Sequence, residues 1–83
     1  EMFDKAAEIY QKIAEEKNEP YYWKEACEFW KQAGNKDNAA ECLGKYSEEE
    51  PWYWEDTAKL WEEVGNKERA RIAWEKSLAY YLE

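Results

Sequence analysis

The segment Pro20–Glu50, PYYWKEACEFWKQAGNKDNAAECLGKYSEEE, is repeated in Pro51–Glu83, PWYWEDTAKLWEEVGNKERARIAWEKSLAYYLE. A shift of 31 residues aligns Pro20 with Pro51, Tyr22 with Tyr53, Trp23 with Trp54, Trp30 with Trp61, Gly34-Asn35-Lys36 with Gly65-Asn66-Lys67 and Ala39 with Ala70. A fixed period of about 20–50 residues is typical of stacked units, each too small to bury its own apolar face. The segment therefore predicts a repeat architecture, which favours an interaction scaffold and leaves the partner open.

Apolar residues recur at helical spacing along the whole chain, and neither an alternating run nor a hairpin turn predicts a strand. We predict an all-α fold of five antiparallel helices. They are expected at 4–16, from 20 to a stop at 34–35, from there to about 49, at about 51–64 and at about 67–82. Pro20 suits a first helical turn, and Gly34 suits a left-handed helix end.

One glycine, Gly44, lies inside a predicted helix. At such a position glycine costs about 1 kcal/mol relative to alanine. We expect Gly44 to admit the close approach of a bulky neighbour such as Trp30 or Trp54.

The second and fourth helices each carry two apolar stripes. The stripes are Trp23, Cys27, Trp30 and Tyr22, Ala26, Phe29, Ala33 in the second helix, and Trp54, Ala58, Trp61 and Tyr53, Thr57, Leu60, Val64 in the fourth. A helix that is exposed on one side needs only one stripe, so both helices are expected to be covered on two sides. Much of this small core must come from the six Trp, seven Tyr and two Phe.

At these positions the chain resembles a tetratricopeptide repeat, whose pattern of spaced Trp, Gly, Ala and Pro residues recurs about every 34 residues. The first full repeat carries the pattern at Trp23, Ala26, Cys27, Trp30, Ala39, Leu43 and Pro51, the second at Trp54, Thr57, Ala58, Trp61, Gly65, Ala70 and Trp74, and the first helix resembles the second half of a repeat through Ala6 and Tyr10. The resemblance implies a helical-hairpin solenoid in one domain, 1–83, made of a half repeat 1–19 and the repeats 20–50 and 51–83.

Three features depart from the family pattern. The period is 31 residues, Cys27 and Ala58 occupy the place of a glycine, and Tyr46 occupies the place of an alanine. The shorter link either changes the superhelical twist or places the fold nearer to the related helical-hairpin repeats of the SNAP adaptor type.

The resemblance implies that the first helices of the repeats line a groove for a peptide or for a helix of another protein. The residues of this face are Tyr21, Lys24, Glu28, Lys31, Trp52, Glu55, Lys59 and Glu62. Tyr21 and Trp52 are the candidate anchors, because aromatic residues dominate interface hot spots. The alternative is a solvated helix face with ion pairs such as Glu55 with Lys59.

The chain carries 12 Lys and Arg against 20 Asp and Glu, a net charge of −8 that is spread evenly along it. Such a surface repels phosphate backbones, and the sequence has neither a basic amphipathic face nor a long apolar run. We therefore expect no nucleic-acid or membrane partner, and a protein ligand that is basic or apolar. A family-type clamp for a C-terminal carboxylate is not expected, because Glu28 stands in the place of its asparagine.

Two cysteines, Cys27 and Cys42, flank Gly34 at similar separations, and their equivalents in the second repeat are Ala58 and Ala73. Because cysteine is replaced by alanine at both positions together, we expect the two thiols to face each other. Buried free thiols are favoured, and a disulfide stays open.

Neither metal binding nor catalysis is expected. The sequence has no His, no second pair of Cys and no glycine-rich phosphate loop, so Ser47 and Ser77 lack a base that works near neutral pH. We predict a non-catalytic protein that needs no cofactor.

The two ends of the chain carry apolar residues that no further repeat covers. This candidate assembly surface consists of Phe3, Trp74, Leu78, Tyr81 and Leu82. Repeat arrays need polar caps, so self-association into a dimer, ring or filament is the alternative function. A third possibility is that residues 80–82 fold back over Trp74.

The chain begins at Glu1 rather than Met, which indicates a fragment or a processed product, and its similar repeats leave an engineered repeat protein open. It has no signal peptide, no Asn-x-Ser/Thr site and no dense cysteine framework. An intracellular, cytoplasmic location is therefore expected.

Overall fold

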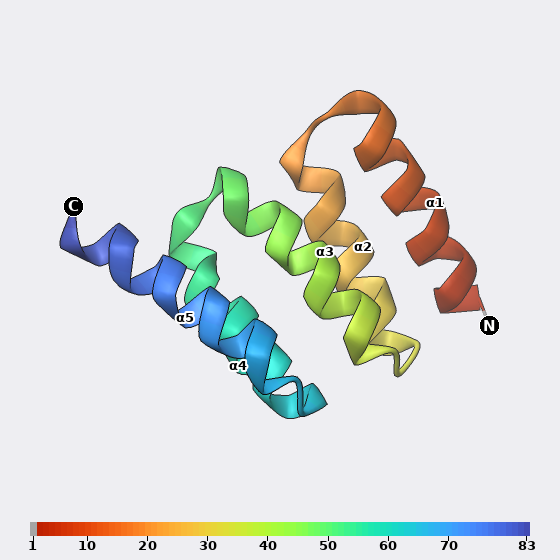
Figure 1. Ribbon diagram of the computed structural model, residues 1–83. Helices are drawn as coiled ribbons and strands as arrows, with labels where there is room; N and C mark the ends of the chain where they lie inside the picture. Colours follow the sequence, from red (N-terminus) through yellow and green to blue (C-terminus); the bar gives the residue numbers. More distant parts are fainter. Residues whose placement is uncertain (1) are drawn as a thin grey trace.

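The computed structural model describes residues 2–83, which form five α-helices (Figure 1). They are α1 (Met2–Lys17), α2 (Pro20–Gln32), α3 (Lys36–Glu49), α4 (Trp54–Val64) and α5 (Lys67–Leu82), and a 3-10 turn, η1 (Pro51–Tyr53), precedes α4. Successive helices run in opposite directions, and none of the described residues forms a strand. The predicted all-α fold with five helices is confirmed.

A glycine followed by an asparagine links α2 to α3 and α4 to α5. Gly34 and Gly65 have φ angles of +83° and +91°, in the left-handed region that glycine adopts without a Cβ clash. The following asparagine caps the next helix: the Asn35 side chain accepts a hydrogen bond from the Asn38 N–H at 3.1 Å, and Asn66 accepts one from the Arg69 N–H at 3.0 Å. A glycine–asparagine pair therefore makes each hairpin turn.

The links that precede α2 and α4 do not contain the glycine–asparagine pair. Asn18 ends α1 with a φ of +58°, and Pro20 then opens α2. The helix expected from residue 51 begins with a tighter turn, because the Tyr53 N–H donates to the Glu50 carbonyl three residues back, at 3.0 Å. α-Helical geometry begins at Trp54.

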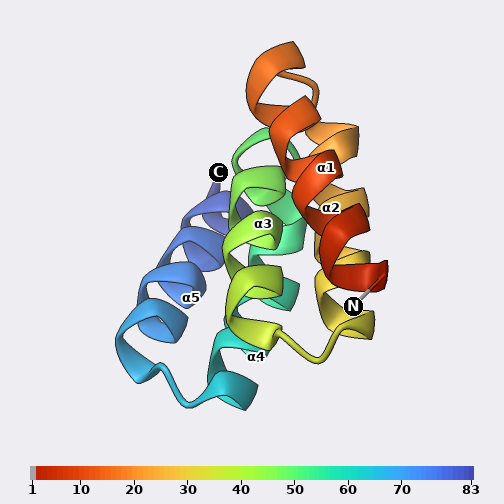
Figure 2. The same cartoon turned by 90° about the vertical axis from the view of Figure 1, so that its right-hand side faces the viewer.

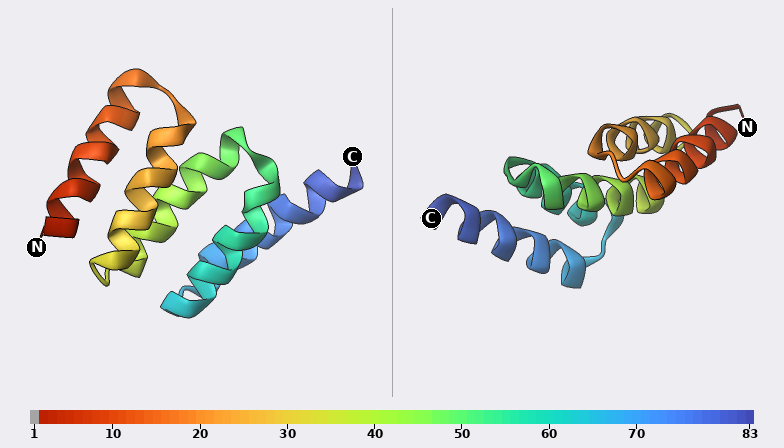
Figure 3. Two further views of the ribbon diagram at one scale, coloured as in Figure 1. Left: turned by 180° about the vertical axis from the view of Figure 1, so that it is seen from behind. Right: turned by 90° about the horizontal axis from the view of Figure 1, so that it is seen from above.

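The helices lie in two layers. In Figure 1, α3 lies in front of α2 and α5 in front of α4, and the view from above in Figure 3 agrees. Figure 2 shows α1, α3 and α5 following one another across one face of the molecule. The Cα trace measures 39 × 28 × 14 Å, so the molecule is a thin slab with two broad faces.

The core combines small residues, which let helix backbones approach, with a few large ones. Its buried members are Ala7, Ala26, Cys27, Trp30, Ala39, Ala40, Cys42, Leu43, Leu60, Trp61 and Ala70. Every residue of the four predicted stripes is buried or half-buried, so the expectation that α2 and α4 are covered on two sides is confirmed.

The contact expected for Gly44 is wrong. A Cβ at this position would meet neither Trp30 nor Trp54 closely, because its near neighbour is the Thr57 methyl, at an ordinary contact distance of 3.8 Å. A small residue of α4, not a tryptophan, faces the glycine.

Candidate functional site

The residues predicted to line a groove on α2 and α4 lie at the surface. Tyr21 is 61% exposed and Trp52 is 51% exposed. Of the others, Glu28, Lys31, Lys59 and Glu62 are exposed, and Lys24 and Glu55 are half-buried. Such exposure suits both a binding face and a solvated helix face.

Several of these residues are engaged within the chain. Lys59 Nζ lies 3.3 Å from Glu55 Oε2, the ion pair expected for a solvated face. Lys24 Nζ lies 5.5 Å from the centroid of the Tyr53 ring and so connects α2 to η1. Burial lowers the pKa of Lys24, but its interactions with the Tyr53 hydroxyl and the Glu28 carboxylate outweigh burial, and the pKa is raised.

The predicted assembly residues are exposed at both ends of the slab. Phe3 is 44% exposed and stacks on Phe29, with ring centroids 6.3 Å apart. Trp74, Leu78, Tyr81 and Leu82 lie on α5, and the Trp74 indole N–H donates to Glu62 Oε2 at 2.8 Å. The structure thus joins Glu62, expected in the groove, to the assembly surface.

Residues 80–82 do not fold back over Trp74. α5 stays helical to Leu82, which is 77% exposed. The whole apolar end of the helix is therefore left open.

The structure also contains a cleft that the sequence did not predict, on the layer that holds α3 and α5. It has a volume of about 530 Å³ and opens between these two helices. Trp54, Thr57 and Trp61 of α4 line it, with Ala40 and Gly44 from α3 and Ile72 and Ala73 from α5. A concave apolar lining with a few polar groups is the usual form of a ligand site.

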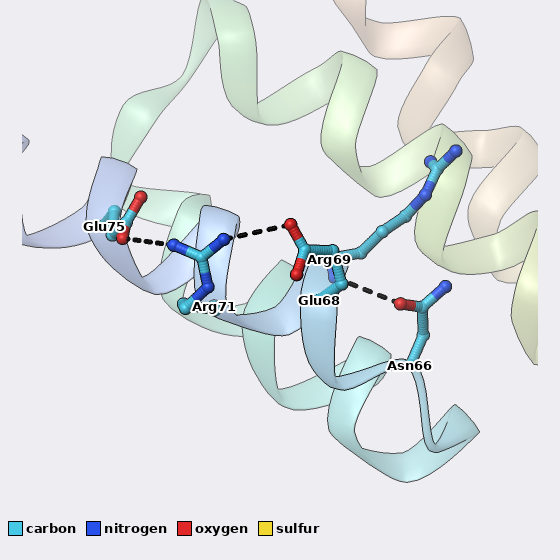
Figure 4. A network of polar contacts seen from close by, with 5 residues as sticks. All are labelled: Asn66, Glu68, Arg69, Arg71 and Glu75. Atoms are coloured by element: carbon cyan, nitrogen blue, oxygen red, sulfur yellow. Dashed lines mark hydrogen bonds and ion pairs between the residues drawn. The ribbon is translucent and has the colours of Figure 1, made fainter.

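Two cations lie over the tryptophan rings of this cleft. The Arg69 guanidinium is 5.0 Å from the ring of Trp61, and Lys76 Nζ is 5.1 Å from the ring of Trp54. Arg69 also lies 3.7 Å from Glu41 of α3, so this side chain crosses the cleft. Figure 4 shows Arg69 extending away from Arg71 and toward α3.

The rim of the cleft carries both signs of charge. Lys45, Arg69 and Lys76 are matched there by Glu41, Glu48 and Glu68. The site is therefore locally neutral on a chain whose net charge is −8.

An equivalent cleft of about 490 Å³ lies between α1 and α3, with Trp30 in its lining. Here the Trp30 indole N–H donates to Gln11 Oε1 at 3.1 Å. A neutral amide of α1 thus contacts Trp30, where an arginine of α5 contacts Trp61.

Sequence reasoning missed the cleft because it assigned Trp54 and Trp61 to core stripes. Trp61 is buried, yet it still borders the opening. The small residues Ala40, Gly44 and Ala73 of α3 and α5 could have predicted the cleft, because they leave space above the two indoles.

Cys27 and Cys42 are free and buried, as expected. Burial raises the pKa of Cys27 to about 11 and, together with the nearby Cys27, that of Cys42 to about 12. Both thiols are therefore protonated near neutral pH, which makes them poor nucleophiles and poor metal ligands. Within residues 2–83, no three His, Cys, Asp or Glu side chains are grouped as metal ligands.

No helix in the described part of the chain combines the length and apolarity that crossing a membrane requires. Comparison of the chain with protein-family models, with curated proteins and with solved structures found no match.

Proposed function

We propose that this chain is a non-catalytic interaction scaffold that binds a peptide segment or helix of another protein in the α3–α5 cleft. The observation that carries the proposal is the pair of indoles, Trp54 and Trp61, bordering an open cleft of about 530 Å³. We further propose that the two hairpins form a tetratricopeptide-like solenoid, in which the two second helices, α3 and α5, flank the ligand. The internal repeat and the matching Gly-Asn turns support this reading.

The cleft suits a ligand that inserts an apolar or aromatic side chain. Trp54, Trp61 and Ile72 offer the apolar contacts, and aromatic residues commonly carry interface energy. The rim is neutral, so the long-range field comes from the rest of the chain, which is acidic. We therefore propose that the residues flanking the anchor are basic.

Both cysteines, Cys27 and Cys42, are free thiols. Free thiols are typical of proteins in a reducing compartment, where disulfides are rare. On this basis we propose an intracellular, cytoplasmic location.

A displayed peptide library, selected on the whole chain, tests the proposal. The decisive variant is Ile72→Glu, because Ile72 is 40% exposed and lines the cleft. The matched control is Leu78→Glu, on the same helix, because Leu78 is 60% exposed and lines a different depression beside Glu62. Selected peptides should lose affinity at least tenfold for Ile72→Glu and keep it for Leu78→Glu.

Indole ¹H–¹⁵N resonances locate the bound peptide. We expect the signals of Trp54 and Trp61 to shift on titration, and that of Trp52 to remain. If Trp52 shifts instead and Trp52→Ala abolishes binding, the ligand occupies the predicted α2–α4 face and the cleft proposal is wrong. If no selected peptide binds this chain more tightly than an unrelated control protein, the proposed scaffold function is wrong.

A further inference from the structure

A stripe of exposed side chains runs along one side of α5. Lys67, Arg71, Trp74, Leu78 and Tyr81 follow one another at steps of four and three residues, which places them on one face of a helix. Leu78 and Tyr81 are 60% and 62% exposed, and Trp74 is 36% exposed. The buried residues of α5 are small, namely Ala70, Ala73 and Ser77, so its large apolar side chains face outward.

The other repeat shows what covers the same stripe there. A shift of 31 residues converts the first four positions into Lys36, Ala40, Leu43 and Ser47 of α3. α4 covers that stripe: Lys36 pairs with Glu63 at 3.1 Å, and Ser47 bonds to Thr57 at 2.7 Å. The stripe on α5 is thus in the position of a helix–helix interface.

The sizes of the side chains show that a copy of α4 does not fit this stripe on α5. Ala40 and Ser47 are small and allow α4 to approach α3 closely. Their equivalents, Arg71 and Leu78, are large and require a wider spacing. Steps of four and three with large residues are typical of coiled-coil pairing between two similar helices.

The charges along the stripe select an antiparallel pairing. Lys67 and Arg71 lie at its first end, whereas Tyr81 lies at its last end. Glu68 and Glu75 hold the Arg71 guanidinium at 2.9 and 2.7 Å (Figure 4). In a parallel pair the two basic ends would repel, whereas in an antiparallel pair each lies beside Tyr81 and the negative end of the helix dipole of the second copy.

We propose that α5 packs antiparallel against α5 of a second copy of this chain, around a two-fold axis near Lys76. Trp74 then packs against Leu78 of the second copy, and Arg71 lies near Tyr81 of the second copy. Because one stripe supplies both halves of each contact, the surface is self-complementary, as a two-fold interface requires. The inference is independent of the proposed function: Arg69, Ile72 and Lys76 line the α3–α5 cleft from the other flank of α5, so the dimer carries two open clefts.

Molar mass in solution, measured by light scattering over a hundredfold range of concentration, tests the dimer. The wild-type chain should approach twice its 10.1 kDa at the highest concentration. Leu78→Glu should stay at 10.1 kDa throughout, whereas Ile72→Glu, the matched control on the cleft side, should behave as wild type. A wild-type mass of 10.1 kDa at every concentration, or equal masses for wild type and Leu78→Glu, overturns the proposal.

Spin-label distances test the orientation. Glu68→Cys and Glu75→Cys each remove one partner of Arg71, and the buried native thiols leave the new cysteine as the reactive one. An axis near Lys76 separates the two labels along the helix by about 3 Å at position 75 and about 24 Å at position 68. Equal label distances at the two positions would instead mean a parallel pair and would overturn the antiparallel arrangement.

Discussion

The hydroxyl of Ser47 on α3 lies 2.7 Å from the hydroxyl of Thr57 on α4, and both residues are buried. The Ser47 proton is committed to the Leu43 carbonyl at 2.8 Å, so Thr57 donates to Ser47. This chain of two hydrogen bonds joins the first full hairpin to the second. It is a buried polar contact of the α3–α4 junction, whereas the Lys36–Glu63 ion pair between the same helices is exposed.

A double-mutant cycle should show that the two hydroxyls depend on each other. Ser47→Ala leaves the buried Thr57 hydroxyl without its partner, and Thr57→Val removes the donor to the buried Ser47 oxygen, so each should lower the free energy of unfolding by about 1–2 kcal/mol. The double variant should cost clearly less than the sum of the single variants. Urea unfolding followed by circular dichroism measures all four free energies, and strict additivity would show that the hydroxyls act separately.

Substituting alanine for two glycines should change stability in opposite directions. Gly44 has helical geometry with room for a Cβ 3.8 Å from the Thr57 methyl, so Gly44→Ala should raise the free energy of unfolding by about 0.5–1 kcal/mol. Gly65 has a φ of +91°, so Gly65→Ala should lower it by about 1–2 kcal/mol. Thermal melts of the two variants measure the signs. Destabilisation by Gly44→Ala would mean that α3 and α4 cannot accommodate the added methyl group beside Thr57.

Features encoded by neighbouring residues were predictable from the sequence. Gly34 and Gly65 adopt the left-handed conformation that ends a helix, and Pro20 suits the first turn of one. These local preferences were enough to predict five helices and the turns between them. The apolar stripes identified the buried faces of α2 and α4 for the same reason. Whether the helices stack as a tetratricopeptide-like solenoid stays a prediction.

The candidate site was not predictable, because it depends on helices that are distant in sequence. Trp61 is apolar and buried, and its sequence context does not tell that one edge of its ring borders a cleft. The opening exists because Ala40 and Ala73 on the flanking helices do not fill the space above the indoles. Likewise, Arg69 crosses to Glu41 only because α3 and α5 lie side by side on one layer.

The buried thiols should make the protein sensitive to alkaline pH. The pKa values of Cys27 and Cys42 rise from 9.0 to about 11 and about 12 on folding, so the folded chain keeps protons that the unfolded chain releases. The stabilisation is complete below pH 9 and is lost as the pH rises toward 11–12. Between pH 8 and 10 we expect the two thiols to lower the free energy of unfolding by about 2–3 kcal/mol.

Urea unfolding at pH 8 and pH 10 measures this loss. The matched control is the double variant Cys27→Ala, Cys42→Ala, which copies Ala58 and Ala73 of the second repeat. It should lose less stability than the wild type between the two pH values. Equal losses would mean that the titration of lysines and tyrosines, not of the thiols, sets the alkaline limit.

Removing the arginine that crosses the cleft should uncover Trp61. Arg69 covers its ring at 5.0 Å and pairs with Glu41 at 3.7 Å, whereas Arg71 pairs with Glu68 and Glu75 of its own helix. Arg69→Gln should therefore shift the Trp61 indole resonance and increase acrylamide quenching, at a cost below about 1 kcal/mol, because the side chains of Arg69 and Glu41 are both more than half exposed. Arg71→Gln removes the same charge two residues along and should leave the Trp61 signal unchanged while weakening the α5 dimer. If both variants move the Trp61 signal equally, Arg69 does not cover the cleft, and its contact with Trp61 has no part in controlling access to the site.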